Sequence, residues 1–201
     1  MIGGHLNWRN PGMGLFGAFG GAALPTYHDN DEDGRAVGYV VGGEAQAYLS
    51  NFTLYGQAGF GDIDVDDGGS RPKSDEGFVQ GWFGGGEVRY FLRENVMLNA
   101  NLAYGKSSDY DGNDAGYIWN WGAGLKIRIT NSMPIYATAD YRGGNYNDDN
   151  GSGDEITEHV ALLGLSFAFG TNSLMQNDRH GATLKLPMLP VRAAAWQEAL
   201  D

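Results

Sequence analysis

The sequence predicts an all-β protein: an eight-stranded antiparallel up-and-down transmembrane β-barrel with a short C-terminal extension. Apolar and polar residues alternate with period two along most of the chain, which is typical of strands with two unlike faces. The 201 residues include 33 Gly, 11 Tyr, 9 Phe and 5 Trp, a composition that favours strands and turns over helices. The apolar runs are separated alternately by short polar breaks and by long acidic segments, so short and long connections alternate along the chain.

The composition excludes several classes of protein. There is no Cys, which removes disulfide scaffolds, zinc ribbons and thiol nucleophiles. With 13 Lys and Arg against 25 Asp and Glu the net charge is −12, which argues against a nucleic-acid partner. No apolar run reaches the ~18 residues of a transmembrane helix. No residue pattern indicates a cofactor.

The predicted strands follow in order along the chain. The first lies in the glycine-rich apolar run 12–24, and the eighth is 159–169. Between them lie three hairpins, in 36–63, 77–107 and 116–145, with polar breaks at Ser50-Asn51, Arg93-Glu94-Asn95 and 130–134. We therefore expect an N-terminal segment 1–11, the barrel 12–169 and a tail 170–201, in which 185–190 is extended and 191–200 forms one short helix.

Four acidic segments are predicted to be the long loops, because they are rich in Gly, Asn, Asp and Ser. They are 28–34, 62–76, 109–114 and 147–155. Two of them carry spaced carboxylates like the start of a calcium-binding EF-hand loop, at Asp29, Asp31 and Asp33 and at Asp62, Asp64 and Asp66. The first lacks the bidentate Glu because Val40 stands there, and the second has Asp67 in place of the glycine. These are weak calcium candidates, and solvated acidic loops are the simpler interpretation.

The distribution of side chains indicates which face of the sheet points outward. The polar faces carry few charges, of both signs, as expected of a narrow interior in which cations and carboxylates pair. The predicted interior polar network is Glu44, Gln46, Glu87, Arg89, Lys126, Arg128, Asp140 and Arg142. The apolar faces carry aromatic residues near both strand ends, the pattern of two membrane interfaces: Tyr39, Phe52, Phe60, Tyr90, Tyr104, Tyr117, Trp119, Phe167 and Phe169. A soluble ligand-carrying barrel, with the apolar face inside, is the alternative.

With these features the chain resembles the small eight-stranded outer-membrane β-barrels of Gram-negative bacteria, of the OmpA-like or porin-superfamily type. That family ends its barrel with an insertion signal, which Gly164, Phe167 and Phe169 match, although Leu162 replaces the usual polar residue and the signal is not at the chain end. The resemblance implies an integral outer-membrane location with extracellular long loops and periplasmic termini. It also implies contacts with outer-membrane lipids including lipopolysaccharide, and with the barrel-assembly machinery. The first residues show no leader pattern, so we expect a mature form or a misassigned start.

The expected function is a structural or surface-interaction role without enzymatic activity, since side chains fill the interior of an eight-stranded barrel. A narrow low-conductance pore is one alternative. A lipid A-modifying enzyme is another, for which Glu158-His159 and Ser107-Ser108 would supply the minimum histidine and serine.

Overall fold

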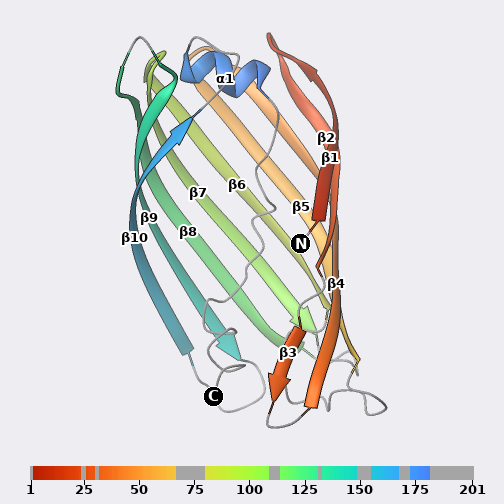
Figure 1. Cartoon of the computed structure of the whole chain (residues 1–201). Helices are drawn as coiled ribbons and strands as arrows, with labels where there is room; N and C mark the ends of the chain where they lie inside the picture. The colour runs from red at the N-terminus through yellow and green to blue at the C-terminus, as the bar shows by residue number, and fades with distance from the viewer. Residues whose placement is uncertain are drawn as a thin grey trace.

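The computed structural model describes residues 2–23, 26–29, 32–66, 80–108, 114–130, 133–148, 155–167 and 173–181. These residues form ten β-strands and one α-helix (Figure 1). The strands are β1 (Ile2–Asn10), β2 (Gly14–Ala23), β3 (Thr26–Asp29), β4 (Glu32–Leu49), β5 (Phe52–Asp66), β6 (Gln80–Arg93), β7 (Val96–Ser108), β8 (Asp114–Arg128), β9 (Ile135–Asp148) and β10 (Glu155–Phe167); the helix is α1 (Leu174–His180). Among the described residues, no helix is long and apolar enough to cross a membrane.

The strands form one up-and-down antiparallel sheet, which confirms the predicted all-β class. Nine strands are neighbours in the order β1-β2-β4-β5-β6-β7-β8-β9-β10, and β3 pairs with the beginning of β4. The turns 11–13, 50–51 and 94–95 lie at one end of the sheet, together with the end of β8 and the start of β9, and this end is here called the short-turn end. The opposite strand ends, such as Asp66, Gln80 and Ser108, are here called the long-loop end. Two of the predicted polar breaks coincide with the turns 50–51 and 94–95, and the third lies between β8 and β9. Helix α1 lies at the short-turn end (Figure 1).

The ninth strand of this order is β1, which the sequence reading placed outside the barrel. β1 pairs with β2 over its whole length, from Ile2 opposite Ala22 to Asn10 opposite Gly14. Its residues do carry the period-two signal: Leu6 and Trp8 are exposed, and the residues between and beside them are polar. The run is only nine residues long and glycine-rich at its start, so its alternation is short. The prediction of eight strands therefore missed β1, as well as the short β3 that pairs with β4.

The two edges of the sheet bear on the predicted closure. Within the described residues β1 and β10 are not paired with each other, so the sheet is open here. In an antiparallel order of nine strands the first and the last run in the same direction. Antiparallel closure requires an even number of strands, so these two edges could meet only in a parallel ladder.

The strands extend further into the acidic segments than predicted. β5 continues to Asp66 and β9 to Asp148. The first acidic segment is mostly a hairpin, in which Asp29 of β3 pairs with Glu32 of β4. Segments that read as loops by composition thus belong partly to the ladder.

The sheet curls around an inner face. The rings of Phe19 on β2 and Phe83 on β6 lie 6.1 Å apart, although β4 and β5 separate their strands. Together with Val40 these two rings form a buried apolar cluster inside the curl. The opposite, outer face exposes large apolar side chains on nearly every strand: Leu6, Phe16, Val41, Leu54, Val88, Leu98, Leu102, Trp119, Tyr141 and Leu165.

The inner cluster requires glycine on the strands beneath it, which gives a first prediction. A Cβ atom at Gly42 would overlap the Phe19 ring and lie 2.5 Å from the carbonyl oxygen of Ala58. We expect Gly42→Ala to lower the free energy of unfolding by about 1–3 kcal/mol through overpacking, measured by urea unfolding. The matched control is Gly43→Ala, because the nearest atom to its Cβ, the Gly17 oxygen, is 3.7 Å away. Equal losses in the two variants would contradict the packing argument.

Candidate functional site

Helix α1 forms where its sequence supplies both a cap and an anchor. The Ser173 side chain accepts a hydrogen bond from the Gln176 backbone N–H at 3.1 Å, which caps the first turn. Leu174 is buried in a cluster with Phe91 and Tyr136 of the sheet. The backbone N–H of Met175 donates to the carbonyl of the β6–β7 turn residue Glu94 at 3.1 Å. These contacts hold a seven-residue helix at the short-turn end.

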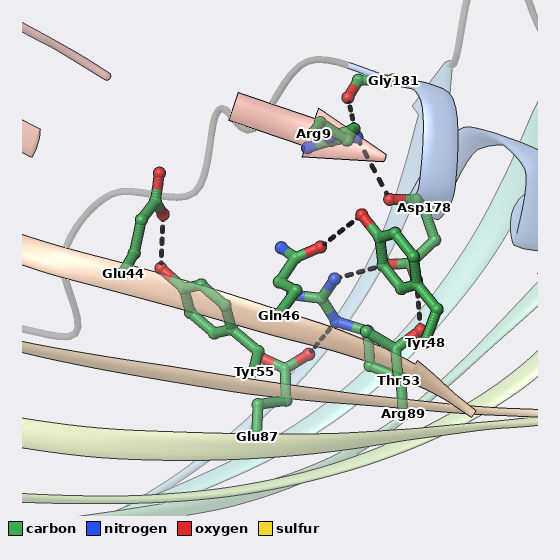
Figure 2. A network of polar contacts seen from close by, with 10 residues as sticks. All are labelled: Arg9, Glu44, Gln46, Tyr48, Thr53, Tyr55, Glu87, Arg89, Asp178 and Gly181. Carbon is green, nitrogen blue, oxygen red and sulfur yellow. Dashed lines mark hydrogen bonds and ion pairs between the residues drawn. The ribbon is translucent and has the colours of Figure 1, made fainter. Parts of the chain in front are cut away.

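One turn further on, α1 points the carboxylate of Asp178 at the inner face. The Asp178 side chain is 6% exposed. The Thr53 hydroxyl donates to its Oδ2 at 2.6 Å, and the Arg89 guanidinium donates to its Oδ1 (Figure 2). Thr53 and Arg89 are cross-strand partners in the β5–β6 ladder. The carboxylate therefore lies against two adjacent strands of the sheet.

Two further arginines hold the C-terminal part of α1. The Arg9 guanidinium on β1 donates to the backbone carbonyls of Asp178, at 3.3 Å, and Gly181 (Figure 2). Carbonyls at a helix C-terminus lack intrahelical partners and carry partial negative charge, so a cation there is favourable. Arg179 of α1 donates to the carbonyl of Ser50, whose φ of 47° lies in the left-handed region at the β4–β5 turn. The helix is thus tied to both the first strand and a turn of the sheet.

A second layer of polar groups lies deeper in the curl. The Arg89 Nε donates to Glu87 Oε1 at 2.7 Å. The Tyr55 hydroxyl donates to Glu44 Oε2 at 3.0 Å, and the other oxygen of Glu44 lies 2.9 Å from His5 Nδ1. Glu44 and Glu87 are both buried. Buried carboxylates are tolerated when they are hydrogen-bonded, as Glu44 is by Tyr55 and as Oε1 of Glu87 is by Arg89.

The predicted interior network falls into two groups in this structure. Glu44, Gln46, Glu87 and Arg89 come together on β4 and β6, where Gln46 accepts a 3.0 Å hydrogen bond from Tyr48. The other four lie on β8 and β9, near the edge of the sheet formed by β10. Lys126, Arg128 and Asp140 are half-buried, and Arg142 is exposed. Lys126 Nζ lies 5.3 Å from the Tyr136 ring centroid, and Arg128 Nε donates to the Thr130 carbonyl at 2.9 Å.

The prediction omitted several residues that the structure adds to the network, among them His5, Arg9, Tyr48, Thr53, Tyr55 and Asp178. His5 and Arg9 belong to β1, so recognising that strand would have found them. Thr53 and Tyr55 were on a predicted polar face and lacked a charge to single them out. Asp178 carries no sequence signal, because its partners are 89 and 125 residues away.

The predicted interface aromatics lie on the outer face in two regions. Near the long-loop end, Tyr104 contacts Trp119 at 4.6 Å, Trp82 at 5.3 Å and Tyr117 at 6.3 Å between ring centroids. Near the short-turn end, Phe52 and Tyr90 stack at 4.5 Å. The remaining described members are exposed: Tyr39, Phe60 and Phe167. Phe169 lies outside the described residues.

The remaining candidates are the serine and histidine residues of the enzyme alternative and the insertion signal. Ser107 and Ser108 are on β7 and His159 is on β10, so β8 and β9 separate them by about three strand spacings, ~14 Å. His159 instead lies 2.8 Å from the Tyr141 hydroxyl. Of the insertion signal, Gly164 pairs with Thr138, and Phe167 is the last residue of β10.

The calcium hypothesis stays a prediction. Asp31 lies outside the described residues, as do the predicted tail elements 185–190 and 191–200. Of the other candidates, Asp62 accepts a hydrogen bond from Tyr39 at 3.1 Å, and the side chains of Asp29, Asp33, Asp64 and Asp66 are not described. Within the part of the chain that is described, no three acidic or histidine side chains group as a metal site would.

No protein-family model matches the chain, and no curated protein is significantly similar to it in sequence.

Proposed function

We propose that the sheet closes into a β-barrel through its edge strands β1 and β10 and is anchored in a lipid bilayer, as the outer-membrane barrels of Gram-negative bacteria are, with a structural or surface-interaction role. The observation that carries the proposal is the placement of polar and apolar side chains. Glu44, Gln46, Gln57 and Glu87 are buried on the inner face, while Leu98, Leu102 and Leu165 are exposed on the outer face. A fold that buries carboxylates and exposes leucines is suited to a hydrocarbon surrounding.

The extent of the outer apolar face supports the same proposal. Monomeric soluble proteins rarely expose contiguous apolar patches of more than a few hundred Å². Here exposed apolar side chains recur on every strand from β1 to β10 except the short β3, for which side chains are not described. The aromatic clusters around Tyr104 and around Tyr90 lie at opposite ends of this surface, as rings at two membrane interfaces do.

The proposal includes an orientation and partners. By analogy with outer-membrane barrels, the acidic long-loop end would be extracellular, and the short-turn end with α1 periplasmic. Outer-membrane lipids including lipopolysaccharide would surround the outer face, and the barrel-assembly machinery would insert the chain. Enzymatic activity is not part of the proposal.

Folding into lipid tests this directly. We expect the denatured full chain to fold in detergent micelles or phospholipid vesicles and to migrate on gels faster unheated than heated. Heated samples of the same preparation are the control for migration. A chain that folds and stays monomeric in buffer without detergent would overturn the proposal, because its apolar face would then meet water.

A narrow pore is the second candidate function. The half-buried charged side chains Lys126 and Asp140 and the exposed Arg142 favour it, because this part of the inner face is less buried than the surroundings of Glu44. The buried groups around Glu44 and the docked α1 favour a filled interior. We therefore expect planar-bilayer recordings of the purified protein to show no steady openings, and reproducible unitary currents would favour the pore.

A further inference from the structure

We propose that Thr53 and Arg89 form a carboxylate-binding site on the inner face, which Asp178 of α1 occupies as a ligand supplied by the same chain. The class of external ligand for this site is a carboxylate-bearing molecule that reaches the short-turn end. The proposal does not depend on a membrane location, because every contact in it lies on the inner face.

Both donors of this site belong to the sheet. Thr53 and Arg89 pair directly across the β5–β6 ladder, so their side chains project side by side from one face. Thr53 is fully buried, and the Arg89 side chain is 12% exposed. Glu87 Oε1 accepts from the Arg89 Nε at 2.7 Å, and the Tyr55 ring lies 5.5 Å from the guanidinium carbon. These contacts fix the guanidinium and aim its Nη1 at the carboxylate position (Figure 2).

The donor set suits a carboxylate. A hydroxyl donates to one oxygen of Asp178 and a guanidinium to the other, so both oxygens have a donor from the wall. Charge-assisted hydrogen bonds of this kind are roughly twice as strong as neutral ones. Arg9 adds a second positive charge close by, on the carbonyls of Asp178 and Gly181.

The occupant is separable from the wall. Asp178 stands beyond the last strand, in a helix of seven residues. Helices this short are not stable alone, so α1 depends on its contacts with the sheet. The main tethers besides Asp178 are the buried Leu174, the backbone contact of Met175 with Glu94 and the arginine contacts of Arg9 and Arg179. The donors thus come from the sheet and the carboxylate from a separate element, an arrangement in which a small carboxylate can replace the Asp178 side chain.

Chemical rescue tests the proposal. The Asp178→Ala variant of the full chain removes the carboxylate and leaves its site. We expect sodium acetate to lower the unfolding equilibrium constant of this variant, compared with sodium chloride at equal ionic strength. The decrease should be about three-fold when the acetate concentration is twice the dissociation constant of acetate for the site. Wild type should show no such difference, because Asp178 already fills the site. An identical response of Asp178→Ala to acetate and chloride would overturn the proposal.

Two controls separate a site from a general salt effect. Glu94→Ala removes an exposed carboxylate from the same end of the sheet, and it should respond to acetate no more than wild type does. Adding Arg89→Gln to Asp178→Ala should abolish the acetate response. A response that persists without Arg89 would place the acetate elsewhere and overturn the site.

The test holds even if Asp178→Ala fails to fold in chloride. The variant is then refolded in acetate, and the folded fraction is measured by intrinsic tryptophan fluorescence. We expect acetate to restore folding at least in part. No recovery over the chloride sample would overturn the proposal.

Discussion

Replacing Arg89 with alanine is expected to lower the free energy of unfolding by about 3–5 kcal/mol, the largest effect of any single substitution in the polar network. Arg89 donates to Glu87 at 2.7 Å and to Asp178, and both carboxylates are nearly buried. Without the guanidinium, two buried negative charges lose their shared cation. Equilibrium unfolding in urea, followed by tryptophan fluorescence, gives the value.

Three companion variants sharpen this measurement. Arg93→Ala removes an exposed arginine from the end of the same strand, and it should cost no more than about 0.5 kcal/mol. Arg89→Lys keeps the positive charge but lacks the planar guanidinium with its several donors. Its loss of unfolding free energy should therefore lie between those of Arg93→Ala and Arg89→Ala. Adding Asp178→Asn to Arg89→Ala should recover part of the loss, because one uncompensated carboxylate is removed. If Arg89→Ala and Arg93→Ala cost the same, Arg89 is not the cation that holds these groups together.

Placing an arginine in the middle of the outer face is the second large effect that we expect. Ala100 lies on β7 opposite Val88 of β6 and Ala123 of β8, between the two aromatic regions. If this face meets hydrocarbon, Ala100→Arg should destabilise the folded chain in vesicles by about 2–4 kcal/mol. If it meets water, the same exposed substitution should change the stability by no more than about 0.5 kcal/mol.

Two control variants separate the effect of the position from the effect of the introduced side chain. Met133→Arg introduces the same charge at an exposed residue between β8 and β9, outside the strands, and should leave the stability nearly unchanged. Ala100→Leu should preserve or raise stability in vesicles, because hydrocarbon favours the larger apolar side chain. A neutral Ala100→Arg in folded, vesicle-bound protein would contradict the proposed lipid-facing surface.

Period-two alternation made most of the sheet predictable from the sequence. It works where a strand is long and its two faces differ, as in β8, where tryptophan and leucine alternate with asparagine and lysine. It fails where few residues carry the signal. In β1 two glycines interrupt an already short run, and missing this strand also removed His5 and Arg9 from the predicted interior.

Helix α1 was not predicted from the sequence either, for a different reason. The prediction placed a helix at 191–200, where Ala, Glu and Leu have high helix propensity. The described helix, Leu174–His180, contains Asn and Asp, which favour caps and turns over helix interiors. Its stability comes from a serine cap, one buried leucine and contacts with distant strands. No local pattern encodes contacts of this kind.

The arginine on the first strand also gives α1 a place in the order of folding. Arg9 reaches the carbonyls of Asp178 and Gly181 across 169 and 172 residues of sequence, whereas the sheet ladders join neighbouring hairpins. Closing a loop of that length carries an entropic cost that local pairings do not. The contact can form only when the strands between have brought β1 and the end of β10 to the same end of the sheet. We therefore expect α1 to dock late in folding, after the strands of the whole meander are in register.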